Sequence, residues 1–349
     1  MKICYFGIYD PEYSRNKILI SGLRQNGIEV TECVSRKKGF SKYFDLIKKH
    51  RAIKNNYDVI IVGFPGFQSV ILAKFITKKP IIFNAFVSMY DSIVLDRAQV
   101  RRGSLKALYF WCLDKISMSI SDVVLFDTEE HIKFVSREFN IKHRKFKRIF
   151  LGTDTLVFYP REKPQSDLFK VVFYGHYIPL QGTEYIVKAA KLLEGNKDIV
   201  FEIIGGGKGK EKMLDLAKSL GLKNIDFTEN VSLVELAERM SSADVCLGIF
   251  GDTGKTMRVI PNKVYDSMAL SRPLITADTP AIRELFGPEE VFFTKTASPE
   301  SIAEAILKVK SDRENAKAVA KRGFDKFTRT VGVEALGLEL KKIIESLIK

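Results

Sequence analysis

Short apolar runs alternate with longer amphipathic segments along the whole chain. The first apolar run, residues 2–8, is followed by helical periodicity over about 14–26 and by a second apolar run at 29–33. We expect further buried strands at 58–62, 80–83, 121–126, 170–174, 199–204, 224–227, 243–249 and 274–277. Strands that alternate with helices in this way predict an α/β protein with parallel sheets and helices on both faces.

A polar segment with two prolines, residues 158–167 (FYPREKPQSD), separates the chain into two halves. We therefore predict two doubly wound, parallel-sheet (Rossmann-like) domains, over residues 1–157 and 158–332. Ligands of such folds bind outside the carboxyl ends of the strands. The natural site for a ligand is then a cleft that both sheets face.

The composition is that of a folded, two-domain protein. A chain of 349 residues suits two α/β domains, and 46% hydrophobic residues argue against disorder. The start of the chain lacks the apolar region of a signal peptide, and no segment has the length of a membrane-spanning helix. We expect a cytoplasmic protein with buried, unpaired cysteines at Cys4, Cys33, Cys112 and Cys246.

The positive charge of the chain is concentrated in its first half. The net charge is +14, and residues 1–160 hold 27 Lys and Arg residues against 15 Asp and Glu residues. Anionic lipid headgroups and nucleic acid are both attracted by such an excess. No nucleic-acid module is recognisable in the sequence. We therefore expect no nucleic-acid partner. Peripheral binding to an anionic membrane, on the inner face of the cell membrane, and an ordinary basic surface remain as alternatives.

Residues 251–286 carry the clearest chemical signal. A glycine-containing loop with two cations, Lys255 and Arg258, leads to Pro261 and Asn262 at the start of a predicted helix. A helix start beside cations is an anion site, and phosphate is its usual ligand. Lys263 and, one turn later, Asp266 would add a cation and an acid for sugar hydroxyls. The alternative is an ordinary loop–helix–strand unit.

This stretch resembles the nucleotide-sugar signature of the retaining group 1 glycosyltransferases of the GT-B fold. That signature has two glutamates separated by seven residues; aligned on Met268, Ala269 and Pro273, the second is Asp266 and the first is Arg258. Further motifs of the resemblance are Gly152-x-Asp154, Phe158-x-Pro160, IIGGG at 203–207 and VSLVELAERMSSADV at 231–245.

The resemblance implies that the C-terminal domain binds a nucleotide-sugar donor and the N-terminal domain an acceptor. It also implies a last helix, 333–349, that packs back on the N-terminal domain. His176 and Gln181 stand where the family has Arg and Lys, so Lys255, Arg258 and Lys263 are expected to replace that charge. The predicted donor-binding set is Gly175, His176, Gln181, Gly205, Gly206, Glu229, Lys255, Arg258, Asn262, Lys263 and Asp266.

On the acceptor side, Gly7, Arg15 and Asn16 follow the first strand and could reach a ligand; alternatively, Asp10 and Ser14 only cap the next helix. The family's His-Asp pair is absent after residues 80–83. Asp91 and Asp96 follow instead, on a loop expected to face the cleft, as candidates to orient or deprotonate the acceptor hydroxyl. Each could instead only pair with a nearby arginine: Arg97, Arg101 or Arg102.

The sequence contains no Asp-x-Asp motif, and its four histidines are scattered. We therefore expect no metal and no other cofactor. The predicted function is a retaining, metal-independent glycosyltransferase (a hexosyltransferase) that moves a sugar from a nucleoside-diphosphate sugar, such as a UDP-sugar, to a glycan or lipid-linked acceptor in polysaccharide biosynthesis. The alternatives are a nucleotide-sugar epimerase of the GT-B fold and a non-catalytic binder of nucleotide or lipid.

Overall fold

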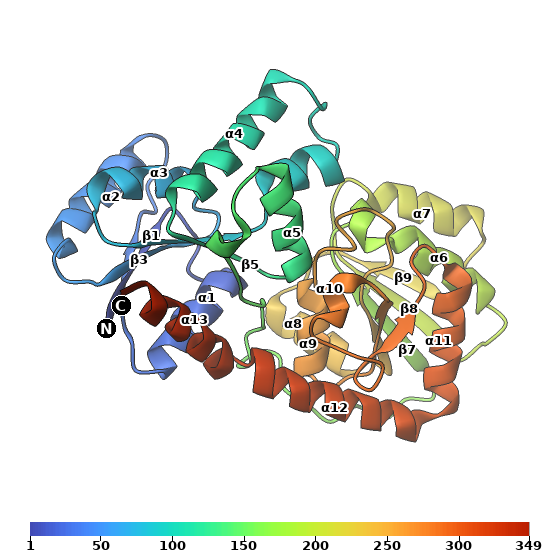
Figure 1. Ribbon diagram of the computed structural model, residues 1–349. Helices are drawn as coiled ribbons and strands as arrows, with labels where there is room; N and C mark the ends of the chain where they lie inside the picture. Colours follow the sequence, from blue (N-terminus) through green and yellow to red (C-terminus); the bar gives the residue numbers. More distant parts are fainter. Residues whose placement is uncertain (349) are drawn as a thin grey trace. The chain divides into compact units, whose positions relative to one another are not determined.

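The computed structural model describes residues 1–348 and divides them into two compact units. The N-terminal unit contains Met1–Asp154 together with the chain from Val331 onward, and the C-terminal unit is Thr155–Thr330 (Figure 1). Each unit holds one six-stranded sheet in which every strand pair is parallel. The predicted α/β class with two parallel sheets is confirmed.

The N-terminal sheet has the strand order β2-β1-β3-β4-β5-β6. Its inner strands, β1, β3, β4 and β5, are short and apolar, and the second, third and fourth residues of each are buried, as expected for a sheet that is covered on both faces. The strand bounds are β1 Lys2–Gly7, β2 Glu29–Val34, β3 Val59–Val62, β4 Ile81–Phe86, β5 Val123–Phe126 and β6 Phe146–Arg148. The sequence pattern missed β6, because two of its three residues are cationic.

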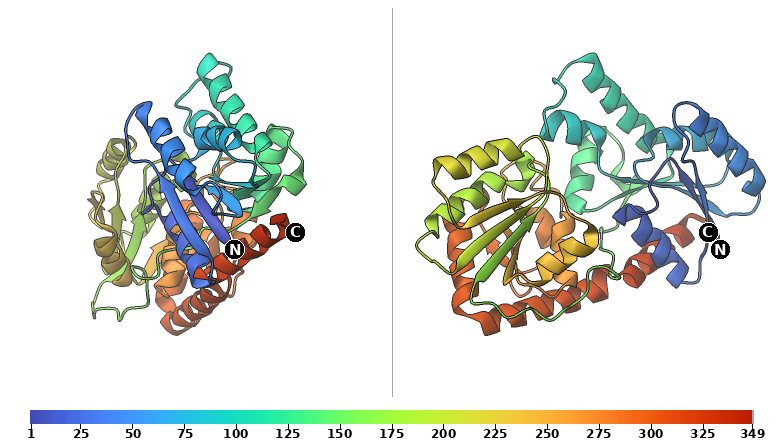
Figure 2. Two further views of the ribbon diagram at one scale, coloured as in Figure 1. Left: turned by 90° about the vertical axis from the view of Figure 1, so that its left-hand side faces the viewer. Right: turned by 180° about the vertical axis from the view of Figure 1, so that it is seen from behind.

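Helices cover both faces of this sheet (Figures 1 and 2). Residues of α2, α3, α4 and α5 share one hydrophobic core with the strands, and α1 packs along the last helix, α13. The helix bounds are α1 Ser14–Gln25, α2 Ser41–Ile53, α3 Phe67–Ile76, α4 Leu105–Ile120, α5 Glu129–Glu138 and α13 Val333–Ile348, with a π-helix η1 at Asp91–Asp96 and a 3-10 turn η2 at His143–Lys145.

The packing of α13 on α1 depends on two glycines. Gly22 and Gly337 face each other so closely that a Cβ atom on either would overlap the backbone of the other helix. Asn26 Nδ2 also donates a hydrogen bond to the carbonyl oxygen of Glu334, at 3.0 Å. The end of the chain is therefore an integral part of the N-terminal unit.

The C-terminal sheet has the order β12-β11-β10-β7-β8-β9. Its strands are β7 Phe169–Tyr174, β8 Ile199–Ile204, β9 Ile225–Thr228, β10 Val245–Leu247, β11 Leu274–Ala277 and β12 Phe292–Thr294. Its helices are η3 Pro179–Gln181, α6 Thr183–Leu192, α7 Lys210–Ser219, α8 Leu233–Ser241, α9 Asn262–Ala269, α10 Pro280–Arg283, α11 Pro299–Ser311 and α12 Arg313–Val331. Buried residues of α6, α11 and α12 form one core with the sheet.

The sequence analysis also predicts buried, unpaired cysteines and no membrane-spanning helix. All four cysteines are free; Cys4, Cys33 and Cys246 are buried and Cys112 is half-buried. Over residues 1–348, no helix combines the length and the apolar character that crossing a membrane requires.

Candidate functional site

The C-terminal sheet changes winding direction between β7 and β10. From β7 the chain moves outward through β8 and β9, and it then returns to the other side of β7 with β10. Loops that follow two such strands diverge and leave a crevice at the carboxyl edge of the sheet, where ligands of doubly wound folds bind. Here these loops are residues 175–182 and 248–261, and both contain predicted donor-binding residues.

The two loops are held together by their backbones. Phe250 N donates to Gln181 O at 3.1 Å, and Gly251 N donates to Leu180 O at 3.2 Å. A Cβ atom on Gly251 would stand 2.8 Å from Leu180 O, and one on Gly182 would stand 2.5 Å from Gly251 N. Only glycine permits this approach. The crevice is thus framed by a fixed backbone arrangement.

Lys263 lies at the centre of this edge. It is the second residue of α9, and only 3% of its surface is exposed. Its Nζ donates to Oε1 of Gln181, lies 3.9 Å from the centre of the Phe173 ring, and would stand 2.9 Å from a Cβ atom on Gly175. Burial lowers the pKa of Lys263 well below its ordinary value, and Asp266 partly opposes this shift. Lys263 is therefore a buried residue and not a solvated one.

Asp266 lies one helical turn after Lys263 and is also buried. Its Oδ2 accepts a hydrogen bond from the hydroxyl of Tyr174, the last residue of β7. Burial, together with the Asp266 carboxylate, raises the pKa of Tyr174 well above its ordinary value, so the tyrosine remains a hydrogen-bond donor. Sequence reasoning missed Tyr174, although a polar aromatic residue directly before Gly175, at the end of an apolar strand, was a usable signal.

A second group of predicted residues lies at the ends of β8 and β9. His176 Nδ1 is 3.2 Å from Gly206 O, and a Cβ atom on Gly206 would stand 3.0 Å from Nδ2 of Asn230 and 3.6 Å from Oε2 of Glu229. Glu229 is exposed and accepts a hydrogen bond from Lys210 Nζ. Gly205 touches the carbonyl of Gly175 so closely that no side chain fits there. This contact joins the second group to Lys263, Gln181, Gly175 and Asp266, which we call the Lys263 cluster.

The remaining predicted donor residues lie on the loop before α9. Lys255 is buried, and Arg258 N donates to Lys255 O at 3.0 Å. The Arg258 guanidinium lies over Gly254, where a Cβ atom would stand 2.9 Å from Nη1. Asn262 is the first residue of α9, whose N-cap, Pro261, makes no side-chain capping hydrogen bond. Lys263 is thus joined to Gln181, and the Arg258 guanidinium lies over Gly254.

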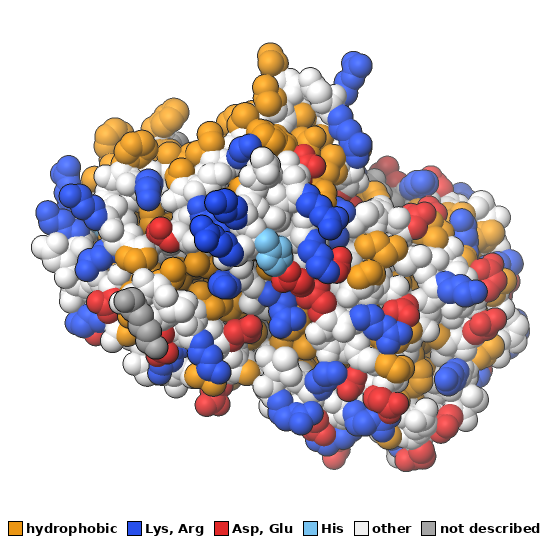
Figure 3. Space-filling model, viewed as in Figure 1, with side chains coloured by type: hydrophobic (Ala, Val, Ile, Leu, Met, Phe, Trp, Pro, Cys, Tyr) orange, Lys and Arg blue, Asp and Glu red, His pale blue; other side chains and the backbone are white. Residues whose placement is uncertain are grey.

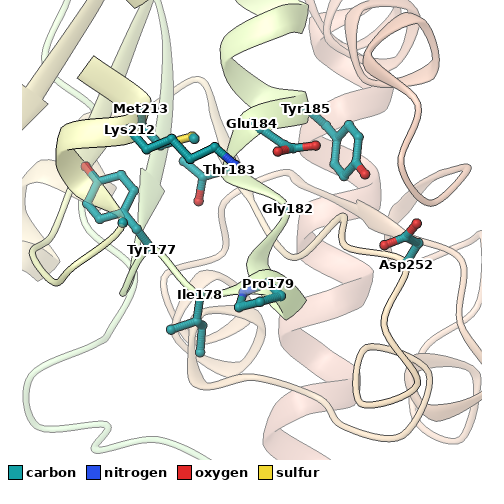
Figure 4. A pocket seen from close by; sticks show the side chains of 11 residues that line it. Tyr177, Ile178, Pro179, Gly182, Thr183, Glu184, Tyr185, Lys212, Met213 and Asp252 are labelled. Atoms are coloured by element: carbon teal, nitrogen blue, oxygen red, sulfur yellow. The ribbon is translucent and has the colours of Figure 1, made fainter. Parts of the chain in front are cut away.

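A cavity of about 310 Å³ adjoins the site (Figure 4). Its walls come from η3, the start of α6, the start of α7 and Asp252 on the loop after β10. In the close-up, Tyr177 and Met213 lie on one side of Thr183, and Tyr185 and Asp252 lie on the other. It shares the loop 175–182 with the site, but its lining residues are not those of the predicted donor set. The cavity is thus a neighbour of the Lys263 cluster and not the cluster itself.

The structure corrects the predicted acceptor-side role of Arg15 and Asn16. Both are fully buried. Arg15 Nε donates to Asn84 Oδ1 at 3.0 Å, and its Nη1 donates to the carbonyls of Ile149 and Phe150 at 2.7 Å each. Asn16 accepts from the Tyr5 hydroxyl and bonds both backbone polar groups of Phe64. These side chains tie strand ends together, so a ligand does not reach them.

Gly7, the third acceptor-side residue, ends β1 with a φ of +139°, a conformation that side chains rarely adopt. The backbone nitrogen of the next residue, Ile8, donates a hydrogen bond to Ser69 Oγ at 3.3 Å. The capping alternative is also wrong: α1 begins at Ser14, and its N-cap is Tyr13, without a side-chain cap hydrogen bond.

Asp91 and Asp96 lie in the π-helix η1, not on a loop, and both are buried. Asp91 Oδ2 is 3.8 Å from His131 Nε2, and His131 Nδ1 is 2.9 Å from Asp127 Oδ1. The three side chains form a buried Asp–His–Asp chain that the sequence did not reveal, because His131 follows Asp91 by forty residues and two elements. This corrects the expectation of exposed carboxylates.

A fourth acid, Asp114 of α4, supports the same region. Its carboxylate accepts hydrogen bonds from Ser88 Oγ at 2.6 Å and from the backbone nitrogens of Met89 and Tyr90 at 3.2 and 2.8 Å. Burial and, to a smaller extent, the neighbouring Asp91 raise the pKa of Asp114 to about 7, against the lowering effect of these hydrogen bonds. Asp114 thus holds the turn that leads into η1.

A metal is not implied by the arrangement of these groups. Within residues 1–348, no group of three or more His, Cys, Asp and Glu side chains is arranged so that it could hold a metal ion. Positive charge at the carboxyl edge of the C-terminal sheet comes from Lys263, from the cations of the loop 251–261 and from the start of α9.

Comparison with known proteins agrees with this picture. Residues 159–326 match the model of the family "Glycosyl transferases group 1". A segment of 111 residues is 29% identical to the putative colanic acid biosynthesis glycosyl transferase WcaI of Escherichia coli (strain K12). This match covers 31% of the chain and 27% of that relative.

Solved structures resemble the chain over almost its full length. The sucrose-phosphate synthase of Thermosynechococcus elongatus has a TM-score of 0.72 at 15% identity, with 99% of each chain covered. Anabaena HepE in complex with UDP-glucose has a TM-score of 0.70 at 14% identity, with 99% of this chain and 100% of that chain covered. At these identities the likeness establishes the fold, which is GT-B. The match to the family model lies within the C-terminal unit, Thr155–Thr330, and the resemblance of the chain to that family is confirmed.

Proposed function

We propose that this protein is a retaining glycosyltransferase that transfers a sugar from a nucleoside-diphosphate sugar to a glycan or lipid-linked acceptor. The observation that carries the proposal is the cluster of Lys263, Gln181, Gly175 and Asp266 at the switch point of a group 1 glycosyl transferase domain. A UDP-sugar is the donor we favour, because Anabaena HepE was solved with UDP-glucose. The similarity to WcaI, a putative glycosyl transferase of colanic acid biosynthesis, favours an acceptor in polysaccharide biosynthesis.

The cluster offers complementary groups for the diphosphate and for the ribose of such a donor. Gly175 has a φ of +147° and no side chain, so a diphosphate can approach the backbone at the point nearest to Lys263 Nζ. The start of α9 adds the positive end of a helix dipole. Asp266 would bind ribose hydroxyls one helical turn away, and the Tyr174 hydroxyl keeps its carboxylate in position.

In the transfer step, the bond between the anomeric carbon and the diphosphate oxygen breaks while the acceptor oxygen forms a bond on the same face of the sugar. The leaving diphosphate takes the proton of the acceptor hydroxyl, which explains why no side-chain nucleophile is needed. Lys263, with the loop cations Lys255 and Arg258, would stabilise the negative charge that develops on the diphosphate. We propose that this step needs no metal ion.

The proposal is tested by product analysis with a panel of nucleotide sugars, with and without acceptor. We expect a glycoside with the anomeric configuration of the donor, identified by NMR, and the same rate in excess chelator. Inversion of configuration, or strict dependence on an added divalent metal, would contradict the mechanism. Conversion of the donor to its epimer without any acceptor would identify a nucleotide-sugar epimerase instead. Donor binding with no chemistry in any condition would identify a binding protein.

Asp266→Ala provides a residue-level test of the same assignment. Because Asp266 is assigned to the ribose, the variant should bind the nucleotide sugar and the nucleoside diphosphate more weakly by similar factors, while its affinity for inorganic pyrophosphate stays unchanged. Calorimetric titration of the three ligands measures this. An equal loss for pyrophosphate would place Asp266 at the diphosphate and not at the ribose.

A further inference from the structure

Helix α4 of the N-terminal unit is apolar on two opposite faces. One face, with Ala107, Leu113 and Met118, is buried in the protein. The other carries Leu105, Leu108, Tyr109, Cys112 and Ile116, which recur at the i, i+3, i+4, i+7 and i+11 positions of a single helical stripe. Leu105 is 87% exposed, and about half of the surface of Leu108, Tyr109 and Ile116 is exposed. A surface helix needs only one apolar stripe to pack on the core of its protein. Folding therefore does not explain the second, exposed stripe.

Helix α3 packs along α4 and continues this stripe. Phe75, near the end of α3, is 84% exposed, and Ile71 and Leu72 lie half-buried on the same face of the helix. The two helices are adjacent at Gln68, whose Nε2 lies 3.5 Å from the Tyr109 hydroxyl. Figure 3 shows hydrophobic side chains gathered over α3 and α4 at the top of the view. We call this surface the α3–α4 face: Ile71, Leu72, Phe75, Leu105, Leu108, Tyr109, Cys112 and Ile116.

Exposed cations stand at both ends of the α3–α4 face. Arg101, Arg102 and Lys106 lie at the start of α4, and Lys74, Lys78 and Lys79 lie at the end of α3. The sequence has no Asp or Glu between Asp58 and Asp91 or between Asp96 and Asp114, and Asp114 itself is buried. The face therefore combines protruding apolar side chains with a positive charge that no acid of these two segments offsets.

We propose that the α3–α4 face docks on an anionic lipid bilayer, with its apolar side chains inserted at the headgroup level and its cations bound to the lipid phosphates. Both parts of the surface are needed for this partner: apolar side chains supply burial in the interface, and clustered Lys and Arg supply attraction to anionic lipid. A neutral protein surface would match the apolar stripe but not the six cations. The inference stands apart from the proposed donor site, which lies in the other unit.

Vesicle sedimentation tests the proposal on the full chain. We expect binding to vesicles of equal parts phosphatidylglycerol and phosphatidylcholine, weaker binding as salt is added, and little binding to phosphatidylcholine alone. Arg101→Gln/Arg102→Gln/Lys106→Gln should weaken binding about 100-fold, at roughly fivefold for each cation near the surface. The matched control is Lys218→Gln/Lys223→Gln/Lys308→Gln, which removes three exposed cations of the C-terminal unit and should have little effect.

The apolar contribution is tested separately. Leu105→Ser/Leu108→Ser should weaken binding at least tenfold, whereas Leu192→Ser/Leu214→Ser, at exposed sites of the C-terminal unit, should not. In a Leu105→Trp variant, the added tryptophan fluorescence should shift to the blue and be quenched by brominated lipid. No binding to either vesicle, salt-independent binding to neutral vesicles, or equal losses in the control variants would overturn the proposal. So would binding without a tryptophan shift, because that is adsorption by charge alone. Donor binding is measured in parallel by calorimetry, so failure here leaves the proposed function untouched.

Discussion

The two units of this protein place polar residues at the same edge of a parallel sheet, and they use them differently. In the N-terminal unit, the cation Arg15 is bonded to the side chain of Asn84 and to two backbone carbonyls that follow β6. In the C-terminal unit, the described hydrogen bond of Lys263 goes to one side chain, Gln181, beside a glycine. A guanidinium fixed by three acceptors holds the fold together, whereas an ammonium with a single side-chain partner can exchange that partner for a ligand. Position at the edge of a sheet is therefore not enough to define a site.

The same contrast applies to the acids of the two units. Asp91, Asp114 and Asp127 lie within the N-terminal unit among hydroxyl, backbone and imidazole partners. Asp266 lies at the strand edge beside Lys263 and is held by Tyr174. We expect changes in the first group to alter stability and changes in the second to alter donor binding.

The largest effect is expected from Arg15→Met. The substitution leaves the carbonyls of Ile149 and Phe150 and the Asn84 oxygen without this donor inside the protein, and it should lower the free energy of unfolding by about 3–5 kcal/mol. Urea denaturation measures this. Arg24→Met, on the exposed side of the same helix, is the control and should change stability by less than ~1 kcal/mol. If Arg15→Met kept its stability and lost affinity for a ligand instead, Arg15 would be a binding residue and not a structural one.

Lys263→Met should show the opposite pattern. Loss of the ammonium should weaken nucleoside-diphosphate binding by roughly 2–4 kcal/mol, the range for truncating one partner of a desolvated charge pair. Stability should not fall, because the change also removes the cost of burying a charge. Calorimetric titration measures the affinity, and Arg258→Ala tests in the same way whether the loop cation contributes. His176→Ala is the comparison variant, with an expected loss below about 1 kcal/mol for a single hydrogen bond.

The pH dependence of nucleoside-diphosphate affinity gives a second test of Lys263. Its pKa is lowered in the free protein, and a bound diphosphate favours the charged form. Binding should therefore take up a proton, and affinity should fall as the pH rises through the lowered pKa of Lys263. Lys263→Met should lack this dependence. Unchanged diphosphate affinity in both Lys263→Met and Arg258→Ala would exclude the idea that these cations replace the family's missing pair.

The last test concerns the dependence of stability on pH that Asp114 should cause. Its folded-state pKa of about 7 lies above its ordinary value, so the folded protein binds a proton that the unfolded chain releases. Stability should therefore fall as the pH rises from about 4 to 7, by up to about 1.4 kcal/mol per unit. Asp114→Asn should flatten this slope, which chemical denaturation at several pH values measures. A parallel change in donor affinity would contradict the separation of the two regions.

The pattern of the sequence predicted the class of the fold because buried parallel strands are short, continuous apolar runs. Ile81–Phe86 and Ile199–Ile204 are examples in which every or almost every residue is buried. The pattern missed β6 and β12, which have three residues each and include polar side chains. It also placed Asp91 and Asp96 on a loop, since a π-helix of six residues has no periodic signature.

At the carboxyl edge of the C-terminal sheet, the residue types and the order of the elements could be predicted from the sequence. The loop with Lys255 and Arg258, the helix that starts at Asn262 and the acid at Asp266 are all readable from local spacing and from the resemblance to a known family. Local spacing could not show that Arg15 is fixed by the carbonyls of residues 149 and 150, or that His131 faces Asp91.

Two α/β halves, a basic first half and a loop with two cations before a helix could be predicted from the sequence alone, because these properties depend on neighbours along the chain. Which polar groups become partners across the chain depends on the tertiary structure. Lys263 and Gln181 are 82 residues apart and become partners because β10 pairs with β7 on the side opposite to β8. That strand order follows from the packing of the complete core, and no periodicity of a single segment contains it.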